Sequence, residues 1–274
     1  MDYTHISIND DEFLTLTGYI KGAYGINLQQ KRGLLEGRLN NYLVKSGYKS
    51  YADYISALKN DKAGREIANL LNRVTTNHTF FMREAEHFEF LRNTVLPQLE
   101  CSVHDRDLRI WCAASSSGEE PYTLAMILEE YFGGKHPEWD KRLLASDLSQ
   151  EILEKAIVGV YPSEGIADVP QSWRKKYFNP RGDTHMQVCE SIRSQVSFRI
   201  FNLMDSIFAK KPYHVVFCRN VMIYFDAPTK ADLANRIYDV MAPGGYLFVG
   251  QTESLIKPTR FNYVMPSVYQ KGMV

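Results

Sequence analysis

The chain has 274 residues, which is long enough to form one large domain and a small one. Hydrophobic residues make up 45% of it and charged residues 23%, as in ordinary globular proteins, so disordered and fibrous classes are excluded. The formal net charge is zero, so no global field attracts nucleic acid or an anionic membrane. Any electrostatic recognition has to come from a local patch.

Hydropathy and cysteine spacing indicate the cellular compartment of the protein. No apolar run reaches the roughly 18 residues of a membrane-spanning helix, and the acidic first residues are unlike a signal peptide. The four cysteines form no CxxC pair and have no histidine at metal-ligand spacing. We therefore expect no disulfide, no metal site, no insertion into a membrane and a reducing, cytoplasmic location. The cysteines are Cys101, Cys112, Cys189 and Cys218.

The first 75 residues predict a small helical domain. Leucine, isoleucine and tyrosine recur at helical spacing in residues 13–20, 28–43, 51–58 and 67–74, and no strand pattern interrupts them. Gly33 and Gly37 each weaken the second helix by about 1 kcal/mol, or else they allow another helix to approach closely.

Residues 76–95 are expected to form a linker that covers a cofactor. Asn77, Thr79 and Arg83 offer an amide, a hydroxyl and a fixed cation, and a guanidinium can hold a carboxylate with two hydrogen bonds. The alternative is a simple linker whose polar residues cap the helix predicted at 86–95.

From about Leu108 onward, short apolar runs alternate with helical stretches. This pattern is typical of a parallel sheet with helices on both faces. Residues 262–271 alternate and are compatible with a terminal hairpin strand. The polar, turn-rich residues 161–196 are expected to form a small inserted antiparallel subdomain, since structureless loops of that length are uncommon; a surface excursion is the alternative. The predicted strands are 108–114, 142–146, 197–201, 213–218 and 246–250, and the predicted helices are 119–132, 150–158 and 230–241.

The junction after the first strand carries the strongest binding signal. Small residues run from Ala113 to Gly118, and a helix begins at once with Glu119, Glu120 and a proline in its first turn. Small residues let a ligand approach the backbone at the carboxyl ends of the strands. Two carboxylates would repel a pyrophosphate but favour a cation, and S-adenosylmethionine carries an ammonium and a sulfonium. The alternative role of the carboxylates is to complement the helix dipole.

Further polar side chains follow the later strands. Asp147 comes directly after the second strand, where a carboxylate can accept the hydroxyls of a ribose, although it could also cap the next helix. Asn202 and Leu203 follow the third strand, and Arg219 and Asn220 follow the fourth. An asparagine amide can form hydrogen bonds with the edge of an adenine ring, while a leucine side chain packs on the face of that ring. Any one of these residues could be purely structural, but together they predict one site.

These motifs resemble the chemotaxis protein methyltransferase (CheR) family over nearly the whole chain. The specific segments are residues 77–83, 113–122, 145–147 and above all the decapeptide 217–226. The resemblance implies a Rossmann-like class I methyltransferase sheet with a terminal antiparallel hairpin, a helical domain at 1–75 and a methyltransferase domain at 96–274. It also implies that S-adenosylmethionine is the cofactor, with S-adenosylhomocysteine as the product. By resemblance, the cofactor site is lined by Asn77, Thr79, Arg83, Glu119, Asp147, Asn202, Leu203, Arg219 and Asn220.

The reaction implied by the resemblance converts glutamate side chains of chemotaxis receptors into methyl esters. A glutamate has an unperturbed pKa near 4.3 and is already an anionic nucleophile at neutral pH. Alignment and desolvation can supply most of the acceleration, roughly 7–11 kcal/mol. The reaction therefore needs neither a catalytic acid or base nor a metal, and we predict no catalytic residue and no metal ligand.

The cytoplasmic methylation region of a receptor is the expected partner. Lys31, Arg38 and Lys45 recur every seven residues, so on a helix they form one basic stripe that can meet an acidic coiled coil. The alternative is a solvated helix face. Some members of the family grip a receptor's terminal pentapeptide with the inserted subdomain and have a glycine-rich turn there. Residues 180–185 contain only Gly182, so we expect docking that does not depend on the pentapeptide.

Three other functions remain open on the sequence. A regulatory module could hold S-adenosylhomocysteine without turnover, and a methyltransferase could act on another substrate. Nucleic acid is disfavoured as that substrate because the chain has no basic, aromatic surface pattern. An NAD-dependent dehydrogenase is disfavoured because the glycine fingerprint is missing.

Overall fold

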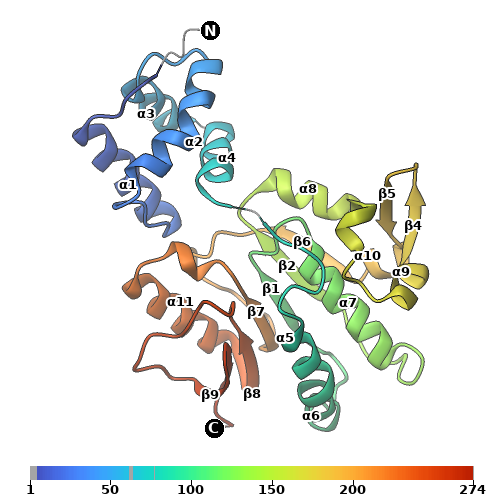
Figure 1. The fold of residues 1–274 in the computed structure, drawn as a ribbon. Coiled ribbons are helices and arrows are strands. Elements are labelled where there is room, and N and C mark those ends of the chain that lie inside the picture. Colours follow the sequence, from blue (N-terminus) through green and yellow to red (C-terminus); the bar gives the residue numbers. More distant parts are fainter. Residues whose placement is uncertain (1–4, 62–63, 77, 274) are drawn as a thin grey trace. The chain divides into compact units, whose positions relative to one another are not determined.

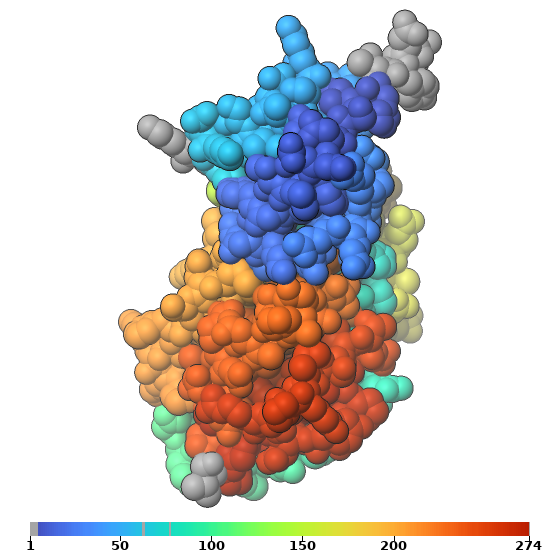
Figure 2. Space-filling view, turned by 90° about the vertical axis from the view of Figure 1, so that its left-hand side faces the viewer, coloured from blue at the N-terminus to red at the C-terminus, as the bar shows by residue number. Residues whose placement is uncertain are grey.

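The computed structural model describes residues 5–61, 64–76 and 78–273. They fall into two compact units. The helical unit contains the described residues before His78 together with Tyr224–Thr229, and the sheet unit contains the remainder. Figure 1 shows the elements of both units, and in Figure 2 the residues of the helical unit, coloured dark blue to cyan, form one continuous body. No helix in these described ranges is long and apolar enough to cross a membrane.

In the described residues before His78 the helical unit contains four helices, as the periodicity predicts. They bury one apolar face each, including Leu16, Leu35 and Tyr51. Both ends of the first helix have a local cause: Asn9 and Glu12 form a capping box, and Gly25 ends the helix at φ 72°. The helices are α1 (Asp10–Tyr24), α2 (Arg32–Lys45), α3 (Tyr51–Lys59) and α4 (Arg65–Val74).

The sheet unit is built on a seven-stranded sheet with the strand order β6-β2-β1-β7-β8-β10-β9. The first five strands in this order are parallel, and the last two form an antiparallel hairpin at one side. The predicted mixed α/β fold with a terminal hairpin is therefore confirmed. The strands are β1 (Ile110–Ala113), β2 (Leu143–Asp147), β6 (Val196–Ile200), β7 (Tyr213–Cys218), β8 (Met241–Phe248), β9 (Asn262–Met265) and β10 (Val268–Gln270).

Helices cover both faces of the sheet. Val215 and Phe217 of β7 belong to the large apolar core, whereas Val216 between them points to the opposite face. The core side is covered by α5 (Ala85–Phe90), a π-helical turn (Leu91–Val95), α6 (Leu96–Ser102), α7 (Glu119–Phe132) and α8 (Gln150–Val158). Right-handed crossovers place α11 (Ala227–Val240) on the other face, which can be followed in Figure 1.

The inserted antiparallel subdomain is also present. It is a three-stranded sheet with the order β3-β5-β4, formed by β3 (Val160–Pro162), β4 (Phe178–Arg181) and β5 (His185–Val188). The sequence interpretation missed its helical turns, which are a 3-10 turn (Ser163–Ile166), α9 (Gln171–Tyr177) and α10 (Glu190–Arg193). Ile166, Tyr177 and Ile192 of these turns are buried in the same core, so tertiary packing holds segments that are too short for a clear periodic pattern.

The two largest differences from the predicted element boundaries are at the starts of α11 and β8. Helix α11 begins at Ala227 rather than at 230, because Asp226 accepts the Thr229 N–H at 3.0 Å and Pro228 fits a first helical turn. Strand β8 begins at Met241 rather than at 246, and its register with β7 shifts near the start. Helix α8, in contrast, has the predicted bounds, since Ser149 caps it and Gly159 ends it at φ 64°.

Candidate functional site

The topology singles out the carboxyl ends of β1 and β7. From β1 the chain crosses to β2 on one side, and from β7 it crosses to β8 on the other side. Ligands of open α/β sheets bind at the carboxyl edge, in the crevice where such connections diverge. Six of the nine residues predicted from the sequence to bind a cofactor end or follow β1, β2, β6 or β7 and so belong to this carboxyl edge. They are Glu119, Asp147, Asn202, Leu203, Arg219 and Asn220.

The turn between β1 and α7 has an unusual backbone. Ala114, Ser116 and Gly118 all have positive φ values, of 60°, 49° and 98°. A β-carbon on Gly118 would lie 2.9 Å from Ala156 Cβ and 3.0 Å from Tyr161 Oη, so only glycine fits there. Strained backbone of this kind is retained where the surrounding structure fixes it, often at ligand sites.

Asp147 is tied to this turn. Its carboxylate accepts the backbone N–H of Ser116 at 2.9 Å and that of Ser149 at 3.0 Å. Burial raises the pKa of Asp147, while these hydrogen bonds favour the charged form. Each carboxylate oxygen has two lone pairs, so both oxygens can still accept from a ligand hydroxyl. Ser149, and not Asp147, caps α8, so the capping alternative is wrong, and ribose binding by Asp147 stays a prediction.

The two adjacent glutamates of α7 have different surroundings. Glu119 Oε2 accepts the Ser117 hydroxyl at 2.7 Å, and burial raises the pKa of Glu119. Glu120 instead pairs with Arg219 Nη1 at 2.9 Å and accepts the Cys112 thiol at 3.1 Å. The partners of Glu120 are thus internal, and Glu119 is the better candidate for a ligand cation.

Arg219 and Asn220 belong to a buried network. The side chain of Arg219 is 1% exposed, and Glu84 lies 3.1 Å from it on the side away from Glu120. Asn220 has φ 57°, and its backbone N–H donates to Glu253 at 2.7 Å. Its side-chain Nδ2 donates to Glu84 at 3.1 Å. The terminal nitrogens of Arg219 therefore face protein carboxylates, whereas its buried Nε has no hydrogen-bond partner among the described residues. The amide oxygen of Asn220 is left as an acceptor.

The other predicted residues that the structure describes lie outside helices and strands. Asn202 accepts the Met204 N–H at 3.0 Å, and Leu203 is buried and follows the end of β6. Arg83 donates to the His78 carbonyl at 2.8 Å and lies over the Phe80 ring. Thr79 is half-buried, and Asn77 lies outside the described residues.

Three residues at this edge were missed by the sequence interpretation as parts of a site. Ser116 lies within the small-residue run 113–118 that the sequence singled out, but its own role became visible only through the contact with Asp147. Glu84 and Glu253 hold the loops after β7 and β8, and no local pattern marks them. Glu253 is buried and its pKa is raised by burial, although it accepts the N–H groups of Gly250 and Ile223.

The residues predicted to dock a substrate lie on or beside α2. Lys31 precedes the helix and Lys45 ends it, and both are exposed. Arg38 is used differently, because its guanidinium donates to the carbonyls of Val74 at 3.0 Å and Thr75 at 3.1 Å. It thereby caps the end of α4. The three cations thus lie on or beside one helix, but the middle one, Arg38, stabilises the helical unit.

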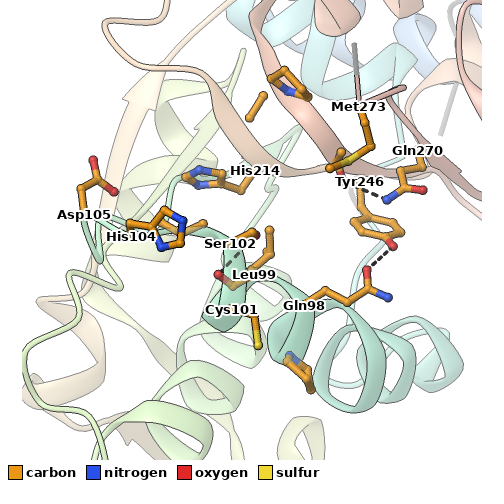
Figure 3. A pocket seen from close by; sticks show the side chains of 15 residues that line it. Gln98, Leu99, Cys101, Ser102, His104, Asp105, His214, Tyr246, Gln270 and Met273 are labelled. Atoms are coloured by element: carbon orange, nitrogen blue, oxygen red, sulfur yellow. Dashed lines mark hydrogen bonds between the residues drawn. The ribbon is translucent and has the colours of Figure 1, made fainter.

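A pocket of about 970 Å³ lies at the opposite, amino edge of the sheet. Its walls come from the end of α6, the starts of β7 and β8, and the last strand, as Figure 3 shows for Cys101, His214 and Gln270. Tyr246 donates across it to Gln98 at 2.6 Å. Of the predicted cofactor-binding residues that the structure describes, none lines it.

The fold and this edge define a class of protein. A parallel sheet with a terminal hairpin, a small-residue turn after β1 and carboxylates after β1 and β2 is the arrangement of an S-adenosylmethionine-dependent methyltransferase. The chain matches the model of the CheR methyltransferase SAM binding domain over residues 77–269, and that of the CheR methyltransferase all-alpha domain over residues 11–75. It therefore belongs to the CheR methyltransferase family.

Individual relatives agree with this family. Over 273 residues the chain is 38% identical to the chemotaxis protein methyltransferase of Borreliella burgdorferi, covering 98% of this chain and 96% of that protein. It is 35% identical to chemotaxis protein methyltransferase Cher2 of Pseudomonas putida, with 91% and 92% covered. It is 32% identical to the chemotaxis protein methyltransferase of Escherichia coli, with 91% and 86% covered.

The residues at the carboxyl edge fit S-adenosylmethionine chemically. Asp147 retains acceptor capacity for ribose hydroxyls, and Glu119 offers a carboxylate whose charged form a ligand cation would favour. The absence of a side chain at Gly118 keeps the turn between them compact. A bound donor would supply an electrophilic methyl group there.

Proposed function

We propose that the protein transfers methyl groups to glutamate side chains of methyl-accepting chemotaxis receptors and forms methyl esters for sensory adaptation. The observation that carries the methyl-donor part is the pair of half-buried carboxylates, Glu119 and Asp147, beside the strained turn at the carboxyl edge. The names of the relatives support receptors as the class of substrate.

In this reaction the protein's own residues do not have to transfer a proton. A glutamate carboxylate forms the new O–C bond as the C–S bond of the donor breaks, the sulfur keeps the electron pair, and no proton has to move. Since the nucleophile is already ionised at neutral pH, the site has to bind, align and exclude water rather than act as a base. We propose that Glu119, Asp147, Asn202, Leu203 and Asn220 hold the donor, with Thr79, Arg83 and the undescribed Asn77 on the preceding segment.

Within this proposal Arg219 acts through Glu84 and Glu120 rather than by direct contact. Its side chain is buried and carries hydrogen bonds and ion pairs to protein groups on several sides. The resemblance implied that Arg219 lines the cofactor site, and we propose that it supports that site indirectly.

The exposed ends of α2 are proposed to dock the receptor. Lys31 and Lys45 offer cations to an acidic helical bundle, and Leu34 and Val44 are exposed between them at 37% each. Reversing both charges, Lys31→Glu with Lys45→Glu, should lower receptor methylation while leaving S-adenosylhomocysteine binding unchanged. Arg38→Glu is a poor test because it would also remove the cap of α4.

We also propose that docking does not depend on a receptor pentapeptide. A peptide bound by strand addition needs free main-chain donors on a sheet edge. Strand β4 is one edge of the inserted sheet, and Pro180 lies within it. Since proline is confined to edge positions whose nitrogen faces away from the partner strand, it leaves this edge one donor short. A titration with such a pentapeptide should show no micromolar binding.

Methyl transfer to cytoplasmic fragments of several receptors tests the proposed function. With labelled S-adenosylmethionine, the label should enter the receptor and be released by mild alkali, as expected for a carboxyl ester. Alkali-stable label would contradict glutamate as the acceptor. Absence of transfer to every fragment, with donor binding intact, would favour a regulatory module that holds S-adenosylhomocysteine without turnover.

A further inference from the structure

The segment that precedes α5 carries a glutamate with several buried partners. Glu84 has φ 57°, a conformation that a residue with a side chain adopts at a cost, and its side chain is only 11% exposed. Oε1 accepts from Asn220 Nδ2 at 3.1 Å, and Oε2 accepts the Gln251 N–H at 3.1 Å. One carboxylate therefore joins the start of α5 to the loops after β7 and after β8.

The same carboxylate is needed to balance Arg219. The guanidinium lies against the rings of Phe88 and Phe217, and its Nη2 also donates to the Arg83 carbonyl at 2.5 Å. A buried cation requires paired charges and satisfied hydrogen bonds, and removing one partner of such a pair is strongly unfavourable. Glu84 and Glu120 supply these charges from two different chain segments.

The amide of Asn220 takes its orientation from this arrangement. A carboxylate can only accept a hydrogen bond, so the amide group facing Glu84 has to be the NH2. The amide oxygen is then available as an acceptor. At the same time Glu253 holds the backbone of Asn220 in its left-handed conformation. Side chain and backbone are thus fixed by two different glutamates.

We propose that Glu84 is a positioning residue for the methyl donor. It fixes the Asn220 amide as an acceptor and anchors Arg219 and the Arg83 backbone without contacting the donor itself. This inference rests on the proposed cofactor site, in which Asn220 and Arg83 contact the donor. Loss of Glu84 should therefore weaken donor binding more than it slows the chemical step.

The test compares Glu84→Gln with Glu86→Gln, the same change at an exposed position two residues away. Calorimetry should show S-adenosylhomocysteine binding to Glu84→Gln weakened roughly tenfold, the size expected for hydrogen bonds to a charged group. The KM for S-adenosylmethionine should rise by a similar factor, while kcat at saturating donor falls much less. The control should match the unmodified protein in both measurements.

Several results would overturn the proposal. They are an affinity of Glu84→Gln within twofold of the unmodified protein, an equal loss in Glu86→Gln, or a fall in kcat with KM unchanged. All measurements are made below the melting temperature of each variant, so that a stability loss alone leaves the affinity unaltered. If Glu84→Gln does not fold, Glu84→Asp replaces it, because the shorter side chain keeps the charge but moves it away from Asn220. Severalfold weaker binding of S-adenosylhomocysteine to Glu84→Asp would support the proposal. Unaltered binding would refute it.

This test is separable from the proposed function. S-adenosylhomocysteine binding requires no receptor, so a failure of receptor methylation leaves the comparison of the two glutamine variants intact.

Discussion

The two edges of the central sheet differ in ways that bear on function. The amino edge carries the pocket of about 970 Å³, whose walls come from α6, β7, β8 and β10. The carboxyl edge carries six of the seven non-glycine residues with positive φ found in the described ranges: Met82, Glu84, Ala114, Ser116, Asn220 and Ser267. It also carries buried or half-buried carboxylates, among them Asp147 and Glu253.

The two edges therefore offer two different candidates for a ligand site. The pocket has a volume that would suit a small ligand, but none of the described residues predicted to bind the donor lines it. The carboxyl edge instead combines strained backbone with carboxylates whose pKa values are raised by burial. Such costs persist at functional sites, where a ligand or a network compensates for them.

The largest expected effect comes from Gly118→Ala. The added methyl group would clash with Ala156 and Tyr161, and alanine disfavours φ 98°. Strain and clash together should cost about 3 kcal/mol or more of unfolding free energy and abolish S-adenosylhomocysteine binding. Gly134→Ala is the control, because nothing lies within 4 Å of its added carbon. Equal denaturant midpoints and equal affinities for the two variants would show that the turn is not constrained as described.

A second effect concerns acid stability. Burial, followed by the charge of Arg219, lowers the pKa of His87 to about 4. In the unfolded chain a histidine takes up a proton near pH 6.5, so the protein should lose up to about 3 kcal/mol of stability as the pH falls from 6.5 to 4. Above pH 6.5 both states are neutral at this residue and the effect vanishes.

The measurement is urea unfolding between pH 4 and pH 8 for His87→Gln, with His185→Gln, an exposed histidine, as its control. The first variant should have a flatter dependence of stability on pH than the unmodified protein, and the second should not. Buried carboxylates such as Glu253 act in the opposite direction, so only the difference between proteins is informative. Parallel curves for all three would contradict a buried, neutral His87.

Asp147→Asn tests the carboxyl edge with little change of shape. Removing the charge should weaken S-adenosylhomocysteine binding by roughly 10- to 100-fold, because hydrogen bonds to a charged group are lost. Calorimetry should show no such change for Asp168→Asn, which alters an exposed aspartate. Unchanged affinity in the first variant would remove Asp147 from the proposed site.

The smallest effect is expected at the amino edge. Ser102 lines the pocket there, and Ser102→Trp should occupy part of its volume without reaching the carboxyl edge. S-adenosylhomocysteine should bind this variant with the affinity of the unmodified protein. A loss of binding together with a folded circular dichroism spectrum would move the donor site to the pocket.

Much of this fold is predictable because its signals are local. Strand β7 has the predicted bounds, since its apolar run is bounded by Pro212 and Arg219. Helix α8 has a capping serine and a terminal glycine. The small-residue turn after β1 was likewise visible in the sequence, although the positive φ values of Ala114 and Ser116 were not.

The parts that escaped prediction depend on contacts between distant residues. Arg38 is at a helical spacing from Lys31 and Lys45, yet only the position of α4 shows that it caps that helix. Glu84 and Asn220 are 136 residues apart, and neither has a local pattern that would reveal their hydrogen bond. The sequence could therefore nominate residues for the site but could not separate ligand contacts from supporting ones.

Backbone hydrogen exchange with and without S-adenosylhomocysteine tests the central claim, that the donor binds at the carboxyl edge, most directly. The amides around Ser116, Asn202 and Asn220 should become protected when the ligand is added, while those around Ser102 and Gly244 at the pocket should exchange at the same rate. Protection confined to the pocket, with the turn after β1 unaffected, would contradict this account.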